Sequence, residues 1–345
     1  MAVKRSELKE WAKENMKGVE NALLPSFTPD LSGLDEEGIR WDVRQSIKHG
    51  FFATLCCSEA GLTFEEAKRF LEIVADEAKG KIFASTTVLF DSFEQNFEML
   101  KHAKKVGCHH VLIGYPPNFY PKSEEEIYRV TKEMCDAVPD LGIVLFPTYY
   151  YNFERFHPSG FPPGLLSRMA DIKNTVAMKI GINEAGFISE CFHRCGEKVL
   201  VSSPQERWAP LLVPEYGQQW IGAAAYELYQ SPEKPYLVEY FNLMLKGQMD
   251  KAMKIYWKLK PVRMCWEARI FPTLVVGTYH WPQWKYFQWL VGGNGGYTRQ
   301  PVMKMYQHDM DECKMVLRSI GITPREPDEE FYVGRVNYAK AKKAK

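Results

Sequence analysis

The stretch Asn174-Thr-Val-Ala-Met-Lys-Ile-Gly-Ile182 is a short apolar run that contains one charged residue, Lys179. A polar turn at 171–174 precedes it. A strand that is apolar on both faces is typical of the centre of a parallel sheet or barrel. An ammonium group there is costly unless it is paired, and desolvation favours the neutral amine, which attacks carbonyl groups. The stretch by itself leaves two interpretations open, a lysine at the strand end that extends to solvent and a Schiff-base lysine, and the rest of the chain favours the second.

Similar apolar runs recur along the chain and alternate with amphipathic helices. Thr63-Phe-Glu-Glu66, for example, has the pattern of a capping box at a helix start. Eight runs that alternate with helical or irregular connectors predict parallel strands, and hence an α/β fold of the (β/α)8 TIM barrel type. The predicted strands are 21–27, 51–57, 81–88, 108–115, 142–146, 174–182, 198–203 and 220–226, and the predicted helices are 34–50, 63–78, 91–106, 123–138, 158–170, 183–195 and 205–216.

The strand pattern stops at Pro232. We therefore expect two parts: a barrel with a short N-terminal extension over 1–230, and a C-terminal helical layer packed on it over 231–345. An aromatic stretch, His280–Trp289, is interpreted as core packing, with an oligomer contact or a pocket lining as alternatives. The basic tail 340–345 is expected to be a frayed, solvated end. Helices are predicted at 236–246, 249–270 and 302–320.

Composition excludes several classes of protein. The 345 residues carry 44 basic and 43 acidic side chains, a net charge of +1, which gives no sign of a nucleic-acid partner. The first ten residues lack the apolar core of a secretory signal, and no apolar run is long enough to span a membrane. Eight cysteines in a chain of this length do not suggest a disulfide framework, so we expect a reducing, cytoplasmic setting.

Metal and nucleotide sites are not indicated. Cys191 and Cys195 share one face of a predicted helix while His193 points elsewhere, and no second ligand pair with metal-site spacing is present. The glycine-rich 292–296 lacks the strand–turn–helix context of a nucleotide-binding fingerprint. We therefore predict no bound metal and no cofactor apart from a covalent lysine Schiff base.

Five further features of the sequence, from about residue 20 to about residue 322, are informative because of their order and spacing. They are Ala22–Asp30, Glu59–Glu66, Gly107–Pro117 followed by Ser123–Glu126, Val176–Gly181, and Pro282–Pro301 with Lys285, Gly292 and Arg299. This series resembles the family of dihydrodipicolinate synthase and N-acetylneuraminate lyase. Those proteins are (β/α)8 class I aldolases and lyases that form a Schiff base with pyruvate or another 2-oxo acid. The resemblance implies that Lys179 is the Schiff-base lysine and that the protein is a homo-oligomer, a tetramer or a dimer.

Three details resemble one branch of that family, the aromatic hydratase-aldolases. They are Asp136–Asp140, Met178–Ile182 and Phe331–Gly334, and the long chain fits the same branch. Those enzymes add water to benzylidenepyruvates and cleave them to pyruvate and an aromatic aldehyde. The resemblance thus implies a bulky or aromatic aldehyde partner.

The sequence departs from the family pattern after the second strand. Where the family has Gly-Thr-Thr-Gly-Glu, which binds the substrate carboxylate, this chain has Thr54-Leu-Cys-Cys-Ser58. Backbone N–H groups survive such a change. The resemblance therefore implies a carboxylate held at the backbone of Cys56 and Cys57, with Ser58 as the substitute hydroxyl.

The second departure is at the end of the fifth strand. The family has a proton-shuttling tyrosine there, and the simplest alignment places Phe146 at that position. Phenylalanine transfers no proton. Tyr149 is our first candidate for that role and Tyr115 the second, whereas Tyr149–Tyr151 alternatively lines an aromatic-accepting pocket. Phe146 itself is expected to line the pocket, together with Ser203 and Tyr226.

These inferences predict a carbon–carbon lyase (an aldolase) or a hydro-lyase that acts on pyruvate or a substituted 2-oxo acid and a bulky or aromatic aldehyde. One alternative is a dehydratase or deaminase-type lyase of the same family on a sugar-acid-like substrate. Another is a barrel that has lost catalysis and serves a binding role, since both departures affect residues that the family uses.

Overall fold

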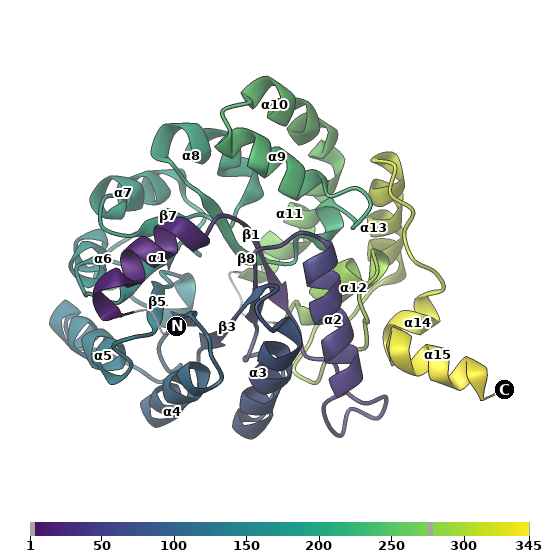
Figure 1. Cartoon of the computed structure of the whole chain (residues 1–345), viewed down its shortest axis with the longest axis horizontal. Coiled ribbons are helices and arrows are strands. Elements are labelled where there is room, and N and C mark those ends of the chain that lie inside the picture. Colours follow the sequence, from purple (N-terminus) through teal and green to yellow (C-terminus); the bar gives the residue numbers. More distant parts are fainter. Residues whose placement is uncertain (1–3, 275–278, 345) are drawn as a thin grey trace. The chain divides into compact units, whose positions relative to one another are not determined.

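The computed structural model describes residues 4–274 and 279–344. In these residues eight strands alternate with helices (Figure 1) and form one sheet in the order β7-β6-β5-β4-β3-β2-β1-β8. Strands consecutive in sequence are neighbours, and β8 lies next to β1, which is the order of a (β/α)8 barrel. The predicted TIM barrel is confirmed. The strands are β1 (Gly18–Leu23), β2 (Ala53–Cys56), β3 (Phe83–Val88), β4 (His110–Ile113), β5 (Gly142–Leu145), β6 (Thr175–Lys179), β7 (Leu200–Ser202) and β8 (Trp220–Ala224).

The chain packs as two compact units. The first comprises Met1–Gly18 and Ser85–Gly222, and the second comprises Val19–Ala84 and Ala223–Lys345. Strands β1, β3 and β8 contribute residues to both. The division at residue 230 that we expect from the sequence stays a prediction.

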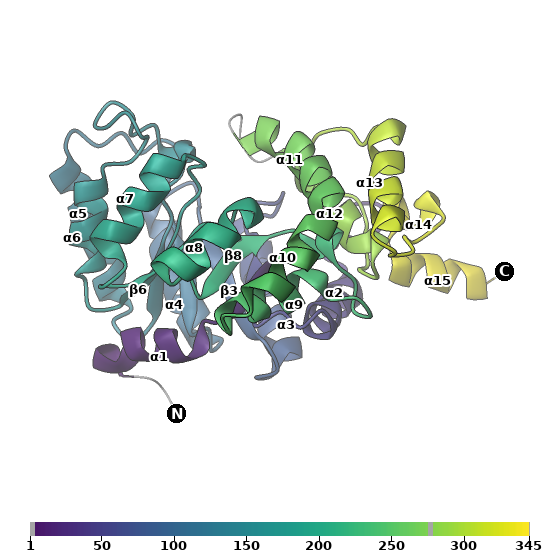
Figure 2. The ribbon, with the colours of Figure 1, turned by 90° about the horizontal axis from the view of Figure 1, so that it is seen from above.

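In the first unit the strands pair in parallel. Strand β4 pairs with β5 from His110↔Gly142 to Ile113↔Leu145, and β6 pairs with β7 up to Lys179↔Ser202. Helices α5, α6 and α7 lie side by side against this part of the sheet (Figure 2). The helices of the unit are η1 (Arg5–Glu7), α1 (Leu8–Asn15), α4 (Phe93–Lys105), α5 (Glu124–Ala137), η2 (Tyr149–Tyr151), α6 (Pro163–Ala170), α7 (Ala185–Cys195), η3 (Glu206–Trp208) and α8 (Ala209–Tyr216).

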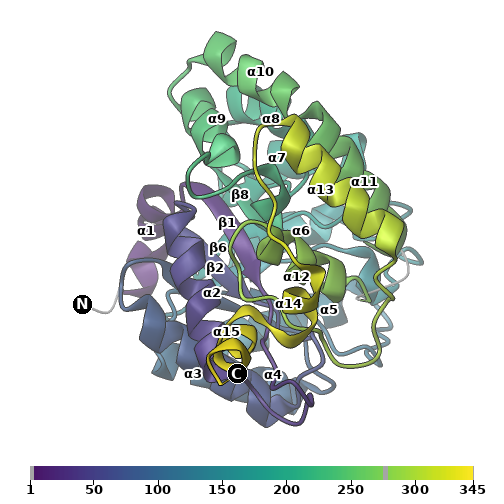
Figure 3. The same cartoon turned by 90° about the vertical axis from the view of Figure 1, so that its right-hand side faces the viewer.

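In the second unit β1 pairs in parallel with β2, and α2 packs against α3. The capping box predicted at Thr63 and Glu66 is confirmed, since each side chain bonds the other residue's backbone N–H. Helices α11 and α13 run side by side (Figure 3). The helices of the unit are α2 (Glu36–Lys48), α3 (Phe64–Ala78), η4 (Tyr226–Tyr229), α9 (Tyr236–Leu245), α10 (Met249–Lys258), α11 (Lys260–Leu274), α12 (Trp281–Leu290), α13 (Gln307–Ser319), α14 (Asp328–Val333) and α15 (Arg335–Lys343).

Several predicted boundaries are wrong. The helices predicted from residues 158 and 302 begin at Pro163 and Gln307, and the strand predicted to reach residue 182 ends at Lys179. The first strand ends at Leu23 rather than at residue 27, because Pro25 has no N–H for the ladder and Ser26 instead accepts from the backbone of Asp35. The helix predicted over 249–270 is two helices that break at Leu259. Pro261 has no backbone N–H, so in one continuous helix it could not donate to the carbonyl four residues earlier. In the first turn of α11, where Pro261 lies, no intrahelical bond needs that donor.

The C-terminal region holds more structure than the sequence predicts. The aromatic stretch is α12, all of whose residues are buried, so the core-packing interpretation is confirmed. The tail is not a frayed end as far as Lys343, because α15 continues to that residue and Lys340 pairs with Glu37 at 2.7 Å. No helix in the described residues combines the length and the apolar character needed to cross a membrane.

Candidate active site

Lys179 is the last residue of β6 and pairs with Ser202 of β7. Every residue of β6 is buried, and Lys179 is only 8% exposed, so its side chain does not extend to solvent as the alternative interpretation required. The carboxyl ends of barrel strands are where TIM-barrel enzymes place their catalytic groups. The structure therefore puts a buried amine at the end of the barrel where catalysis is expected.

Two glycines leave room around this lysine. A Cβ on Gly222 would lie 3.2 Å from Cγ of Lys179, and 2.9 and 3.0 Å from two ring atoms of Trp220. A Cβ on Gly181 would lie 2.9 Å from the ring of Phe146. All four distances are below normal contact for carbon atoms, about 3.5 Å. Neither position accepts a larger side chain without moving a neighbour of Lys179 or the lysine itself.

Phe146 follows β5 directly and lies beside the lysine. The Nζ atom of Lys179 is 4.9 Å from the centroid of the Phe146 ring, within the range of a cation–π contact. Tyr150 meets the same ring edge-on, with 6.0 Å between centroids. The structure thus brings Phe146 to the place where the resemblance implies a tyrosine, but it offers an aromatic face and no exchangeable proton.

Tyr149 carries its hydroxyl toward a carboxylate. The hydroxyl donates to Oε1 of Glu184 at 3.2 Å, and the side chain is partly exposed. Partial burial, together with the negative charge of Glu184, raises the pKa of Tyr149 to about 12. The phenol therefore keeps its proton near neutral pH and can donate it.

Tyr115 lies deeper, in an aromatic cluster. Its ring meets the Tyr151 ring edge-on with 4.9 Å between centroids. Its hydroxyl lies 2.7 Å from Oγ1 of Thr131, and because Thr131 donates to the carbonyl of Ile127, Tyr115 is the donor of that bond. Burial raises the pKa of Tyr115. The hydroxyl proton of Tyr115 is therefore engaged in a hydrogen bond to Thr131 of helix α5.

Ser203 is fully buried just after β7. Its backbone N–H donates to Oε1 of Gln218 at 3.0 Å, and its hydroxyl accepts from the N–H of Gln205 at 3.4 Å. Its neighbour Ser202, which the sequence analysis did not single out, pairs with Lys179, and its hydroxyl accepts from the N–H of Gly222 at 3.0 Å. The signal that points to Ser202 is the shared final position of two adjacent parallel strands.

In the second unit, Cys56 ends β2, and Cys57 and Ser58 follow it. All three are buried, and neither cysteine is part of a disulfide. The backbone N–H of Cys57 donates to the carbonyl of Leu23 at 3.0 Å, which extends the ladder between β1 and β2. This amide is therefore used by the sheet. Tyr226, also predicted as a pocket residue, is buried at the start of η4.

The second unit also buries a lysine that is held by two hydrogen bonds and an ion pair. Nζ of Lys285 donates to the carbonyl of Pro25 at 2.8 Å and to Oγ of Ser26 at 2.9 Å, and it lies 3.9 Å from Oδ2 of Asp42. Burial lowers the pKa of Lys285 to about 8. Because two hydrogen bonds and a nearby carboxylate hold this amine, we interpret Lys285 as a structural group rather than a second candidate nucleophile.

A buried carboxyl group lies close to Tyr226 in the chain. Oε1 of Glu227 accepts from Nδ2 of Asn21 at 2.8 Å and from Nε2 of Gln288 at 3.2 Å, and the residue is 4% exposed. Burial raises the pKa of Glu227 to about 7. Sequence reasoning missed this residue, although an acid inside an apolar run gives the same kind of signal as Lys179 does.

Within the described residues, no group of three or more His, Cys, Asp or Glu side chains is arranged to hold a metal ion. Cys191 and Cys195 are buried on α7, and burial raises the pKa of the Cys195 thiol to about 11. These sulfurs are thus protonated and packed near neutral pH.

The chain matches the family model of the dihydrodipicolinate synthetase family over residues 15–317. It belongs to this family. Curated relatives include the 4-hydroxy-tetrahydrodipicolinate synthases of Methanopyrus kandleri, 23% identical over 90% of this chain and 98% of the relative, and of Syntrophobacter fumaroxidans, 26% identical over 70% and 81%. As a member of the family, the chain is a Schiff-base lyase with a TIM barrel.

Solved structures of the family share the fold. Dihydrodipicolinate synthase from Aquifex aeolicus superposes with a TM-score of 0.73 at 21% identity, over 90% of this chain and all (100%) of that one. N-acetylneuraminate lyase from Fusobacterium nucleatum gives a TM-score of 0.70 at 18% identity, over 88% and 99%. These similarities establish the architecture.

Proposed function

We propose that the chain is a carbon–carbon lyase or hydro-lyase in which Lys179 forms a Schiff base with pyruvate or a substituted 2-oxo acid. The observation that carries this proposal is the buried amine at the end of β6, next to Phe146 and with space kept by Gly222. The amine attacks the keto carbon, water leaves, and the resulting iminium accepts electrons from the neighbouring carbon–carbon bond. That electron sink serves both aldol cleavage and the addition or loss of water.

Proton transfer in this proposal belongs to Tyr149. Its hydroxyl is oriented by Glu184 and retains its proton at neutral pH, as a general acid must. Tyr115 is the weaker candidate, because its proton is donated to Thr131 inside an aromatic cluster. Phe146, the residue in the family's tyrosine position, contributes a surface for substrate rather than a proton.

The partner aldehyde in this proposal is bulky or aromatic. Support comes from the aromatic residues that follow β5: Phe146 is half-buried and Tyr150 meets its ring edge-on. Aromatic pairs of this geometry add about 0.5–1.5 kcal/mol to area burial, so a third ring is a favourable guest. Ser203 and Tyr226 remain proposed lining residues of the substrate site.

The substrate carboxylate is assigned in this proposal to the segment Cys56–Ser58. Because the N–H of Cys57 already donates to Leu23, this proposal relies chiefly on Ser58, the residue of the segment that carries a hydroxyl group.

We also propose that the protein forms a homo-oligomer, either a tetramer or a dimer. Light scattering, measured as the protein elutes from a sizing column, gives the mass of the assembly and tests this directly.

Borohydride trapping tests the proposal. Wild-type protein with pyruvate and borohydride gains a reduced pyruvyl group, which peptide mass mapping locates on Lys179. Lys179→Ala abolishes the adduct, and Lys173→Ala, an exposed lysine near the start of the same strand, leaves it unchanged. Adducts on other lysines with Lys179 unmodified would overturn the assignment.

Product profiling then separates the finer alternatives. Benzylidenepyruvate should yield pyruvate and benzaldehyde, and sugar-acid substrates should turn over at least tenfold more slowly. The reverse preference would support the dehydratase or deaminase-type reaction. A folded protein that forms no adduct with pyruvate or with larger 2-oxo acids would support the non-catalytic barrel.

A further inference from the structure

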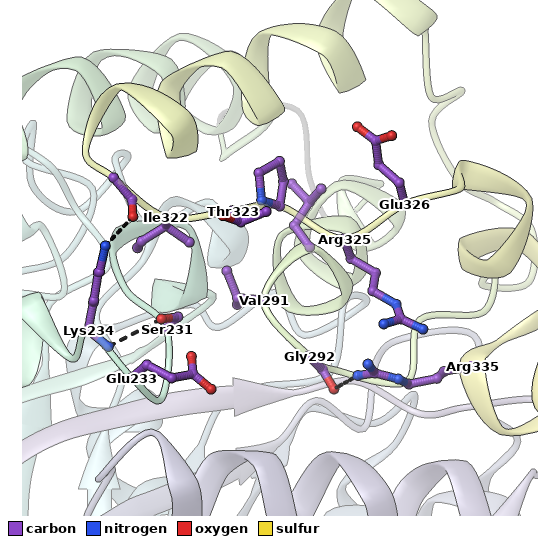
Figure 4. A pocket seen from close by; sticks show the side chains of 13 residues that line it. Ser231, Glu233, Lys234, Val291, Gly292, Ile322, Thr323, Arg325, Glu326 and Arg335 are labelled. Carbon is purple, nitrogen blue, oxygen red and sulfur yellow. Dashed lines mark hydrogen bonds between the residues drawn. The ribbon is translucent and has the colours of Figure 1, made fainter.

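The second unit contains a pocket of about 520 Å³ that includes none of the candidate catalytic residues (Figure 4). This volume lies within the usual range of small-molecule sites, about 300–1,000 Å³. The walls come from the segment before α9, the end of α12, the segment between α13 and α14, and the start of α15. Its lining residues are Ser231, Glu233, Lys234, Leu290, Val291, Gly292, Gly321, Ile322, Thr323, Pro324, Arg325, Glu326 and Arg335.

One part of the pocket is apolar. Val291 and Ile322 are buried beneath it, and Leu290 and Pro324 belong to the same wall. Figure 4 shows Val291 and Ile322 between Lys234 at one end and the two arginines at the other. The cavity therefore has room and apolar surface for the body of an organic molecule.

The other end is cationic. Nε and Nη2 of Arg325 form a fork on the carboxylate of Glu330 at 2.9 and 2.8 Å. Nε of Arg335 lies 3.7 Å from the same carboxylate. One acid thus serves two guanidinium groups, and Oε1 of that acid also accepts from Nε1 of Trp289 at 3.2 Å. The cluster keeps a net charge of +1 that its own members do not neutralise.

Each guanidinium also has N–H groups to spare. Nη1 of Arg335 donates to the carbonyl of Gly292 at 2.6 Å, and the group lies over the ring of Trp41 at 5.1 Å. Among the residues that the structure describes, neither Nη2 of Arg335 nor Nη1 of Arg325 has an acceptor. Burial, and next the nearby charge of Arg325, lower the pKa of Arg335, as expected of two cations held close together.

The remaining charges of the lining lie elsewhere. Glu326 pairs with Arg318 at 2.6 Å and points away from the arginines in Figure 4. Lys234 donates to the carbonyl of Gly321 at the opposite end. Glu233 is exposed on the rim near Lys234. The arginine end is thus the part of the pocket with uncompensated donors.

We propose that this pocket binds a small organic anion, with its carboxylate or phosphate group between Arg325 and Arg335 and its apolar part over Val291 and Ile322. Guanidinium groups suit this role because their fixed N–H pairs match the geometry of carboxylate and phosphate oxygens. The site is independent of Lys179 and of the proposed reaction, so it stands or fails on its own test.

Calorimetric titration of the full chain tests the proposal with three probes: benzoate, phenyl phosphate and the neutral benzyl alcohol. The two anions should bind one per chain, and the alcohol at least tenfold more weakly. Binding should weaken as salt is raised. The same titrations on Lys179→Ala protein should give the same affinities. Loss of binding in that variant would show that the anions occupy the catalytic site, and would overturn the proposal.

Variants then locate the site. Arg325→Gln alone would remove the guanidinium group that forks onto Glu330. The double variant Arg325→Gln with Glu330→Gln keeps the local net charge and should weaken the binding of benzoate about tenfold to hundredfold. Arg129→Gln, which removes an arginine from an exposed pair on α5, is the matched control and should change affinity less than twofold. Glu233→Gln, which removes a rim carboxylate, should tighten binding.

Crystals soaked in 4-bromobenzoate give the position directly, because the bromine is located by anomalous scattering. The expected position is above Val291 and Ile322, with the carboxylate at Arg325 and Arg335. Equal benzoate affinity in the wild type and the double variant, or bromine found only outside this pocket, would overturn the proposal.

Discussion

Replacing Gly222 by alanine probes the geometry of the lysine site most directly. The new methyl group would lie 3.2 Å from Cγ of Lys179 and 2.9 Å from a ring atom of Trp220. Trp220 is 1% exposed within β8, so its ring has little freedom to move. The lysine side chain, with four rotatable bonds, is the neighbour that yields most readily.

The distances set the size of the effect. Normal carbon contact is about 3.5 Å, so the new methyl group is about 0.6 Å too close to Trp220 and about 0.3 Å too close to Cγ of Lys179. Overpacking of this kind costs about 1–3 kcal/mol of stability. A catalytic group that is misplaced by about 1 Å loses on the order of a hundredfold in rate. We therefore expect Gly222→Ala to unfold at lower denaturant and to form the Schiff base with pyruvate about tenfold to hundredfold more slowly.

The assay is the rate of adduct formation in borohydride with pyruvate, measured where unfolding curves show the variant more than about 99% folded. Gly164→Ala is the matched control, since no atom lies within 4 Å of a Cβ at that position. It should react at the wild-type rate. If folded Gly222→Ala also reacts within twofold of the wild type, the inference that Gly222 shapes the Lys179 site is refuted.

Three further predictions concern single side chains. Tyr149→Phe and Glu184→Gln should lower turnover by about a hundredfold or more while adduct formation stays within about threefold, because the hydroxyl moves protons after the Schiff base forms; equal losses in both assays would contradict that role. Burial raises the pKa of Glu227 from its ordinary 4.5 to about 7, so the folded state binds this proton more tightly, and the stabilising effect of the proton is lost as pH rises from 4.5 through 7. Relative to Glu227→Gln, the wild type should lose about 3 kcal/mol of unfolding free energy between pH 4 and pH 8, and denaturant curves that stay parallel across that range would exclude it. Arg299 forks onto Glu66 at 2.7 and 2.9 Å, so Arg299→Lys should lower the unfolding free energy by about 1–2 kcal/mol, which denaturant curves at pH 7 measure and an unchanged midpoint contradicts.

Most of the barrel was predictable because its strands are short apolar runs between helices with recognisable starts. Thr63–Glu66 and Ser123–Glu126 place two helix starts within a residue, since local backbone N–H groups need caps. The misplaced first strand and the broken helix at Leu259 both involve proline, whose effect depends on which neighbour its missing N–H faces. For the first strand, the tertiary fold determines which neighbour that is.

The site was predictable where a residue conflicts with its local setting. Lys179 stands out because a charge in an apolar strand is costly, and its burial is confirmed. Tyr115 and Tyr149 are alike in the sequence, yet one donates to Thr131 in a buried cluster and the other to Glu184 on a partly exposed turn. Hydrogen-bond partners distant in sequence make that difference.

The sequence by itself therefore determined the order of strands and helices, the barrel that this order implies, and the lysine that the barrel buries, because all three follow from local patterns of apolar and charged residues. Only the tertiary structure decided that Gly222 makes room for Lys179, that the backbone N–H of Cys57 donates to Leu23, and that two arginines share the carboxylate of Glu330. The first two are contacts between segments far apart in the chain, and the geometry of all three depends on tertiary packing, which no local pattern encodes.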